Sequence, residues 1–409
     1  MLSRLVPATA MAVGLALGAM PTAASAQPGA AQDRVVPSGA MSRPHPADGV
    51  LAANFNQDLG SLDYHELQAA RATWIRGFFT MPDADKGDVA ATTTIHTILD
   101  ASRRNYGTVL SLKFPLAQTE MPAPGSAAMA AELARVDKVL PVVMGRVDIL
   151  TIGNEPFNES RPQDRTEALN NFYETVAEHV IAYRRAHCAS NCKTQLYMGA
   201  LNRLDLPANR TPVVERWLQF VNATPEIQGV DIHPHVPSRE AVQPFLDYVL
   251  PRLRPDQKFL ATEFSLVWYW QRHMTDPIAP EFAQRYGFAA DAKVWQVIEA
   301  AIAHPFPQQE WNDFLSSSPW YESQKHFLRD QMTAFRATGR LAVAGYGFRQ
   351  DTVMEQNWGP DKVPWLLNSV FAPYTVQPAP NGQAGRGYAW IDDFRDVQRP
   401  ADDQHGAEK

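Results

Sequence analysis

The stretch "VDILTIGNEPFN", Val147 to Asn158, and the segment after it, "DRTEALNNFYETVAEHVIAYRRAH", Asp164 to His187, decide the fold class of this 409-residue chain. The run that ends at Ile152 is apolar or β-branched on both faces, which is typical of a strand buried in a parallel sheet. In the second segment apolar residues recur at steps of three and four, which predicts an amphipathic helix. A buried strand followed by such a helix is one βα unit.

The same unit recurs along the chain. Comparable runs are "VLAANF" (50–55), "ATWIRGFF" (72–79), "GTVLSLKF" (107–114), "VDILTIGN" (147–154), "TQLYMGAL" (194–201), "GVDIHPHV" (229–236), "KFLATEF" (258–264) and "LAVAGYGF" (341–348). Eight runs with helical patterns between them predict an α/β fold, a (β/α)8 TIM barrel. The alternative is an open doubly wound sheet, which usually has a glycine-rich first turn that "NFNQDLG" after the first run does not supply.

The gap between the seventh and eighth runs is longer than the others. Residues 264–341 contain a helical pattern near 281–303 and a connection rich in Trp and Pro. We therefore expect a helical insertion between strands 7 and 8, at one rim of the barrel.

Composition and charge argue against several classes of partner. The chain is 45% hydrophobic and 20% charged, with a formal net charge of −7, which is ordinary for a globular protein. It has no basic stripe, which argues against nucleic acid and anionic membranes as partners. No segment after the N-terminal region has 18 uninterrupted apolar residues, so no membrane span is expected.

The two ends of the chain differ in character from its middle. Arg4, an apolar run and "ASA" before Gln27 predict a signal peptide over residues 1–26, so we expect a periplasmic or secreted protein. Residues 27–48 are expected to be a linker and residues 49–372 the catalytic barrel. The tail, 373–409, is expected either to pack on the barrel or to be partly disordered.

The only two cysteines, Cys188 and Cys192, lie close together in "HCASNCK". An even number of cysteines in an exported protein favours a disulfide, here one that closes a short loop. The alternative is a metal site with His187, although three adjacent ligands make a poor tetrahedral set.

Two carboxylates stand out where the predicted strands end. Glu155 follows the fourth run and Glu263 ends the seventh, 108 residues later, which is three βα units. Functional groups of such barrels lie at the carboxyl ends of the strands, so these side chains can converge across the barrel mouth. Two convergent carboxylates suit glycoside hydrolysis, in which Glu155 has to be protonated and Glu263 ionised.

The peptides "IGNEP" and "ATEFS" resemble clan A, the retaining glycoside hydrolases with a (β/α)8 barrel, in which an Asn-Glu pair ends strand four and a second Glu ends strand seven. The resemblance implies that Glu155 is the acid/base and Glu263 the nucleophile. It also implies that Asn154 bonds a hydroxyl of the reacting sugar, and that Arg76 in "WIRGFF" supports the nucleophile.

The sequence departs from the clan pattern on strand six. Many members carry His-x-Tyr there, whereas this chain has "HPH", so His235 replaces the Tyr near the nucleophile. We expect only one of His233 and His235 to face the site and the other to be packed or supporting.

The aromatic residues of the expected site are less regular. Where the clan often has a Trp at strand eight, this chain offers Tyr346 or Phe348, and Trp358 further on is a substitute. Trp268, in "SLVWYWQRH", is expected either to stack on sugar rings or to be plain packing.

The expected function is therefore a secreted retaining glycoside hydrolase. It would cleave a β-glycosidic bond of an oligo- or polysaccharide by double displacement, as a monomer that needs no cofactor or metal. One alternative is a metal-dependent barrel hydrolase that uses His233 and His235 with a carboxylate. Others are a transglycosylase with the same Glu pair, and a sugar-binding barrel without activity.

Overall fold

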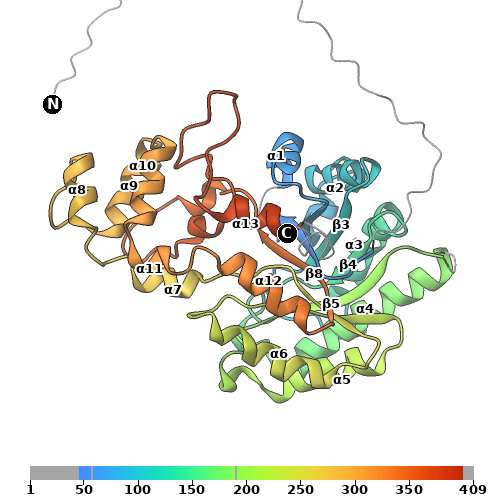
Figure 1. Cartoon of the computed structure of the whole chain (residues 1–409). Coiled ribbons are helices and arrows are strands. Elements are labelled where there is room, and N and C mark those ends of the chain that lie inside the picture. The colour runs from blue at the N-terminus through green and yellow to red at the C-terminus, as the bar shows by residue number, and fades with distance from the viewer. Residues whose placement is uncertain (1–45, 57–58, 189–190, 399–409) are drawn as a thin grey trace, which may run out of the picture. The chain divides into compact units, whose positions relative to one another are not determined.

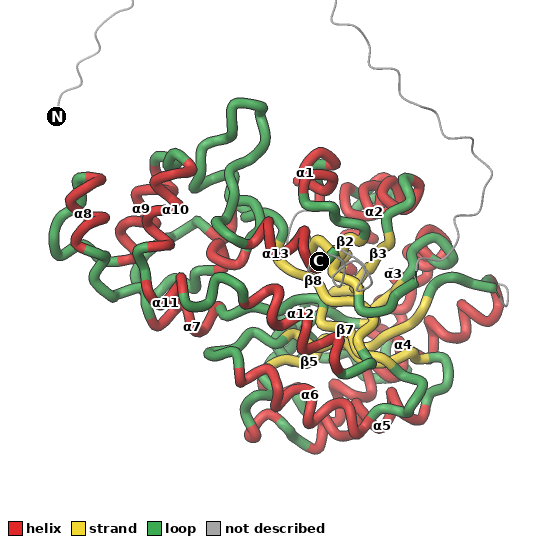
Figure 2. The backbone as a smooth tube through the Cα atoms, in the orientation of Figure 1, coloured by secondary structure: helices red, strands yellow, loops and turns green. Residues whose placement is uncertain are grey.

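Eight parallel strands form a closed barrel in sequence order (Figure 2). The computed structural model describes residues 46–56, 59–188 and 191–398. The strands are β1 (Val50–Asn54), β2 (Trp74–Thr80), β3 (Gly107–Lys113), β4 (Ile149–Ile152), β5 (Gln195–Asn202), β6 (Ile227–His233), β7 (Lys258–Ala261) and β8 (Leu341–Gly347). Strand β1 pairs with β8 from Val50↔Val343 to Asn54↔Gly347, which closes the sheet. The predicted TIM barrel is confirmed, and the open sheet is wrong.

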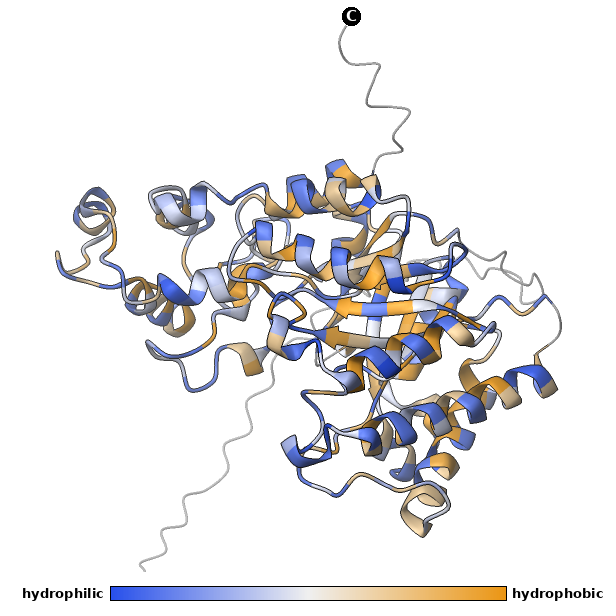
Figure 3. Cartoon of the chain, turned by 90° about the horizontal axis from the view of Figure 1, so that it is seen from below, coloured by the Kyte–Doolittle hydropathy of each residue, from blue (hydrophilic) through white to orange (hydrophobic). Residues whose placement is uncertain are grey.

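Helices surround the strands and bury their apolar sides against them. They are α1 (Tyr64–Ala69), α2 (Thr93–Arg103), α3 (Ala127–Val143), α4 (Glu167–His187), α5 (Pro212–Ala223), α6 (Gln243–Val249) and α12 (Phe327–Ala337). On α4, Leu169, Phe172 and Val176 are fully buried, as the three-four spacing predicts. Figure 3 shows the mixed polarity of these helices, which carry both hydrophobic and hydrophilic residues.

The insertion between β7 and β8 is more helical than its sequence indicates. It contains α7 (Val267–Arg272), α8 (Pro280–Tyr286), α9 (Val294–Ala303), α10 (Gln308–Ser316) and α11 (Pro319–Glu322) before α12. The segment expected near 281–303 is two helices, because Gly287 ends α8 with a φ of 75°. The Trp/Pro-rich connection folds into α10 and α11, with Trp311 and Trp320 buried. Helices α8 to α11 lie to one side of the barrel strands (Figure 1).

The interior of the barrel changes from apolar to polar along the strands. A buried apolar cluster fills the part near the strand starts, namely Ala52, Trp74, Val109, Ile149, Tyr197, Leu260, Ala342 and Val343. Two residues further on, several strands present buried polar groups on the same face, namely Asn54, Arg76, Ser111, Thr151 and Thr262. The fold thus places the polar groups at the carboxyl ends of the strands, next to the apolar cluster that fills the barrel interior.

The expectations for the two ends fall largely outside the described residues. Residues 1–45 and 399–409 are not described, so the signal peptide, most of the linker and the end of the tail stay predictions. Within the described tail, α13 (Trp390–Val397) packs on the barrel, where Trp390 contacts Tyr346 and Phe394 contacts Phe348. No helix of the described chain is long and apolar enough to cross a membrane.

The structure joins Cys188 and Cys192 in a disulfide just beyond α4. His187, the third ligand of the alternative metal site, turns instead toward Tyr183, and the two rings stack 4.2 Å apart. The pairing of the two cysteines therefore agrees with the disulfide expectation.

Candidate active site

The chain turns sharply between β4 and Glu155. Gly153 has a φ of 101°, and a Cβ there would lie 2.2 Å from the carbonyl oxygen of Gly199 on β5. Only glycine permits this close approach. The turn brings Asn154 and Glu155 over the carboxyl end of the barrel.

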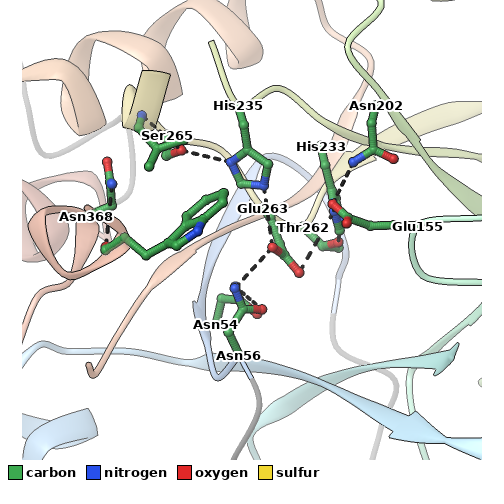
Figure 4. A network of polar contacts seen from close by, with 12 residues as sticks. Asn54, Asn56, Glu155, Asn202, His233, His235, Thr262, Glu263, Ser265 and Asn368 are labelled. Atoms are coloured by element: carbon green, nitrogen blue, oxygen red, sulfur yellow. Dashed lines mark hydrogen bonds and ion pairs between the residues drawn. The ribbon is translucent and has the colours of Figure 1, made fainter. Parts of the chain in front are cut away.

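Three side chains hold Glu155 in place, of which Figure 4 shows Asn202 and His233. Its Oε1 accepts from Asn202 Nδ2 at 2.6 Å and lies 2.9 Å from His233 Nδ1. Its Oε2 accepts from Asn158 Nδ2 at 3.1 Å. The side chain remains 23% exposed, so Glu155 can reach a bound ligand.

Glu263, just past β7, lies deeper and is held more tightly. Arg76 Nη1 contacts its Oε1 at 2.5 Å, and Asn56 Nδ2 donates to its Oε2 at 3.1 Å. His235 Nε2 lies 3.5 Å from the same Oε2. This carboxylate is therefore oriented and charge-paired before any ligand arrives.

The two carboxylates converge as the sequence predicts. Four residues, Glu155, His233, His235 and Glu263, each contribute one imidazole nitrogen or carboxylate oxygen to a close cluster. These four atoms all lie within 4.8 Å of one another. An oxygen of Glu155 is thus within 4.8 Å of an oxygen of Glu263.

His233 controls the protonation of the pair. Burial alone would raise the pKa of Glu155, but the hydrogen bond and charge of His233 outweigh it and lower the pKa to about 2. Burial of Glu263 is likewise outweighed by the charges of His233 and Arg76, which hold its pKa well below the usual range. Burial lowers the pKa of His233, but the charge of Glu263 and the hydrogen bond to Glu155 raise it overall.

These directions favour a proton on His233 over one on Glu155, whereas glycoside hydrolysis as inferred from the sequence requires Glu155 itself to be protonated. A chain of buried groups orients the imidazole. Thr262 Oγ1 donates to Asp231 and lies 2.9 Å from His233 Nε2, so it can accept the Nε2 proton. Nδ1 is then the atom that shares a proton with Glu155.

The expectation that only one histidine faces the site is wrong. Residues two apart lie on the same face of a strand, so alternation itself directs His233, the last residue of β6, and His235 to the same side. A bridge between His235 and Ser265 prolongs the β6–β7 alignment, and His235 Nδ1 bonds Ser265 Oγ at 2.8 Å. Its other nitrogen therefore faces Glu263, and both histidines contact the carboxylate pair.

Arg76 and Asn154 also lie where the sequence predicts. The fully buried Arg76 contacts Glu263, and its Nη2 donates to Asn154 Oδ1 at 2.5 Å. Asn154 Nδ2 donates in turn to Glu159 at 2.7 Å. One amide hydrogen of Asn154 is left for a sugar hydroxyl. Glu159 is absent from the residues predicted for the site, because its position four residues after Glu155 carries no signal.

Two of the aromatic residues expected at the site, Tyr346 and Trp358, lie elsewhere. Tyr346 is fully buried between Phe264 and Trp390, on the outer face of β8, so its assignment to the site is wrong. Trp358 donates its Nε1 hydrogen to the Trp295 carbonyl in α9 and does not line the cavity beside Glu263.

Trp365 is an aromatic side chain that does line the pocket beside Glu263. Its ring lies 4.8 Å from His235, edge to face. Trp268, which is half-buried, lies 6.3 Å from Trp365 and thus borders the site. No sequence signal singled out Trp365, because it lies in an irregular loop well beyond the end of β8.

Beside Glu263 there is a small pocket of about 30 Å³ that opens to solvent. Its lining includes His235, Trp365, Arg349 and Asn368. It combines an aromatic wall with hydrogen-bonding groups around the carboxylate.

Several solved structures that resemble the whole chain are barrel-type glycoside hydrolases. Xylanase B from Clostridium stercorarium F9 matches with a TM-score of 0.46 and 11% identity, covering 84% of this chain and 95% of that one. A family 39 glycoside hydrolase from Bacteroides cellulosilyticus WH2 matches at 0.48 and 12%, covering 88% and 66%. A beta-glucosidase from Exiguobacterium marinum matches at 0.46 and 8%, covering 88% and 98%.

No protein-family model matches the chain, and neither does any curated protein. At these identities, and with TM-scores below 0.5, the structural likenesses carry no argument about activity. The site itself is the basis for any function.

The carboxylates and histidines could also hold a metal ion. Two imidazoles and two carboxylates are donors that zinc accepts. Arg76 fits such a site poorly, because its guanidinium already holds Glu263 Oε1 and would lie beside the positive charge of the ion.

Proposed function

We propose that this protein is a retaining glycoside hydrolase in which Glu263 is the nucleophile and Glu155 the acid/base. The observation that carries the proposal is the short distance between the two carboxylates, whose nearest oxygens lie within 4.8 Å. Retaining enzymes have carboxyl groups about 5–5.5 Å apart, whereas inverting enzymes need about 6.5–9.5 Å to admit a water molecule.

The environments of the two groups support these roles. Glu263 is buried, ionised and paired with Arg76, as a nucleophile requires. Glu155 is more exposed and shares a proton with His233, so it can exchange that proton with a ligand.

The reaction then proceeds in two steps. Glu263 attacks the anomeric carbon, the bond to the leaving oxygen breaks, and that oxygen takes from Glu155 the proton that Glu155 shares with His233. Water next attacks the glycosyl-Glu263 ester, loses a proton to Glu155 and releases the sugar and free Glu263. If a sugar hydroxyl replaces water, the same site performs transglycosylation.

The substrate is proposed to be a β-linked oligo- or polysaccharide met in the periplasm or outside the cell. The cavity beside Glu263 and the signal-like residues 1–26 support this proposal.

The test is turnover of a panel of β-linked polysaccharides and aryl β-glycosides by three proteins: the unchanged enzyme, Glu155→Ala and Glu263→Ala. Each variant should lose at least about 10³-fold in kcat. Azide should restore part of the activity of Glu155→Ala on an aryl glycoside with a good leaving group, because such a group leaves without a proton. Full activity in both variants would contradict the proposal.

The second candidate is a metal-dependent hydrolase, favoured by the close set of Glu155, His233, His235 and Glu263. It predicts a bound transition metal in the purified protein and loss of activity with a chelator. Elemental analysis that finds no stoichiometric metal, together with activity unchanged by the chelator, would exclude it.

A further inference from the structure

A second cavity, of about 150 Å³, opens next to Glu155. It lies between the loop that follows β4, the end of β5 and the start of α5. Asn158 and Asn202, which donate to the two oxygens of Glu155, both line it. This cavity is therefore adjacent to the acid/base, as the first cavity is adjacent to the nucleophile.

The hydrogen bonds of Glu155 indicate which of its oxygens faces the leaving group. In the described part of the chain Oε1 has two partners, Asn202 and His233, whereas Oε2 has only Asn158. A leaving oxygen would therefore meet Glu155 at Oε2 and take there the proton that Glu155 shares with His233. Oε2 lies on the side of Asn158. The group attached to a leaving oxygen that receives this proton therefore enters the second cavity.

The lining of this cavity is cationic. It contains Arg165 and Arg203 but no carboxylate from the described residues. Among the described residues Arg165 forms no ion pair; its Nη2 donates to the Ser160 carbonyl at 3.3 Å. Because arginine binds carboxylates through two parallel hydrogen bonds, Arg165 is suited to a negatively charged ligand.

Arg203 is held in one orientation. Asp205 accepts from its Nε and Nη2, each at 3.0 Å, and the guanidinium lies 5.7 Å from the centre of the Trp268 ring. The backbone of Arg203 is left-handed, with a φ of 50°, a conformation that few non-glycine residues adopt. Asp205 neutralises Arg203, so the excess positive charge of the cavity comes from Arg165.

The remaining walls are largely apolar. Phe157, Leu201, Leu204 and Val214 supply them. Such walls pack against the face of a sugar or aromatic ring.

We infer that this cavity binds the leaving group of the substrate and favours a ring that carries a carboxylate, either a uronic acid or a carboxylated aryl group. The inference rests on the proposed function, because only a glycoside has a leaving group. The residue that selects the charge is Arg165.

The experiment compares leaving groups that differ in charge and little else. One pair is the 3-carboxyphenyl and 3-carbamoylphenyl β-glycosides of the same sugar. A second pair is the disaccharides with a uronic acid or its neutral parent sugar at the leaving position. We expect kcat/KM to be about tenfold higher for the charged member of at least one pair, and which pair shows it identifies the ring.

Arg165→Ala should reduce that ratio to about one, Arg165→Lys should retain part of it, and added salt should lower it. Arg161→Ala is the matched control, because Arg161 lies in the same loop, pairs with Asp164 and does not line the cavity. Thermal unfolding checks that each variant is folded. A ratio near one in the unchanged enzyme for both pairs, or a ratio that Arg165→Ala leaves intact, would overturn the inference.

Titration with 3-hydroxybenzoate and 3-hydroxybenzamide separates this inference from the proposed function. If no glycoside is cleaved but the acid binds more tightly in a manner that depends on Arg165, the anion-binding cavity stands and the hydrolase proposal fails. If glycosides are cleaved without any preference for charge, the hydrolase proposal stands and the anion-binding cavity fails.

Discussion

At the residue scale, His233 decides where the catalytic proton resides. It bonds Glu155 through Nδ1, and Thr262 holds its Nε2. Because the pKa of His233 is raised, the proton shared with Glu155 is lost only above the usual range of histidine. The basic limb of the pH profile of kcat/KM should therefore report the His233–Glu155 pair rather than one carboxyl group.

His233→Asn should move that basic limb to lower pH. The proton must then be held by Glu155 alone, and the ordinary pKa of a glutamate lies below that of a histidine. The measurement is kcat/KM of an aryl glycoside from about pH 4 to 9. His235→Asn is the control, since His235 contacts Glu263 rather than Glu155. A basic limb that stays in place in His233→Asn would show that the histidine does not hold the proton.

At the element scale, the approach of β4 to β5 positions the acid/base. Gly153→Ala places a Cβ 2.2 Å from the Gly199 carbonyl oxygen at an unfavourable φ, so we expect a loss on the order of 2–4 kcal/mol in the free energy of unfolding. Urea unfolding measures this loss, and kcat measures the displacement of Glu155.

Gly359→Ala is the control for that variant, because its added Cβ would meet no atom within 4 Å. It should change the free energy of unfolding by less than about 0.5 kcal/mol. Equal effects in the two variants would mean that the turn at Gly153 is not under steric constraint.

At the scale of the whole molecule, a buried carboxyl lies near the seam where the barrel closes. Glu66 of α1 is 2% exposed, and Arg349, just beyond β8, lies 3.4 Å from it. Burial raises the pKa of Glu66 to about 7, and the charge of Arg349 opposes this only partly. The folded protein thus holds a proton between pH 4.5 and 7 that the unfolded chain releases.

The contribution of Glu66 to stability is therefore present below pH 4.5 and lost as the pH rises through 7. It amounts to about 3 kcal/mol at most. Urea midpoints at about pH 5 and pH 7.5 should differ less in Glu66→Gln than in the unchanged protein. Glu240→Gln, on the surface, should leave the difference as it is. If the urea midpoint falls by the same amount between about pH 5 and pH 7.5 in all three proteins, the pH dependence comes from other groups, His233 among them.

The sequence by itself determined the barrel and the carboxylate pair. Apolar runs alternate with helical periods, and the carboxyl ends of parallel strands meet at one rim. The sequence alone could therefore place Glu155, Glu263, Asn154 and Arg76 together. These are consequences of local periodicity and chain order, which are visible without coordinates.

Only the tertiary structure decided how those residues behave. It buried Tyr346 on the outer face of β8 and brought Asn202 and Trp365 next to the site. It also placed His233 against Glu155, which lowers the pKa of Glu155 and raises that of His233. The physical reason is that burial, charge pairing and loop contacts depend on residues far apart in the chain, and no spacing within one segment encodes them.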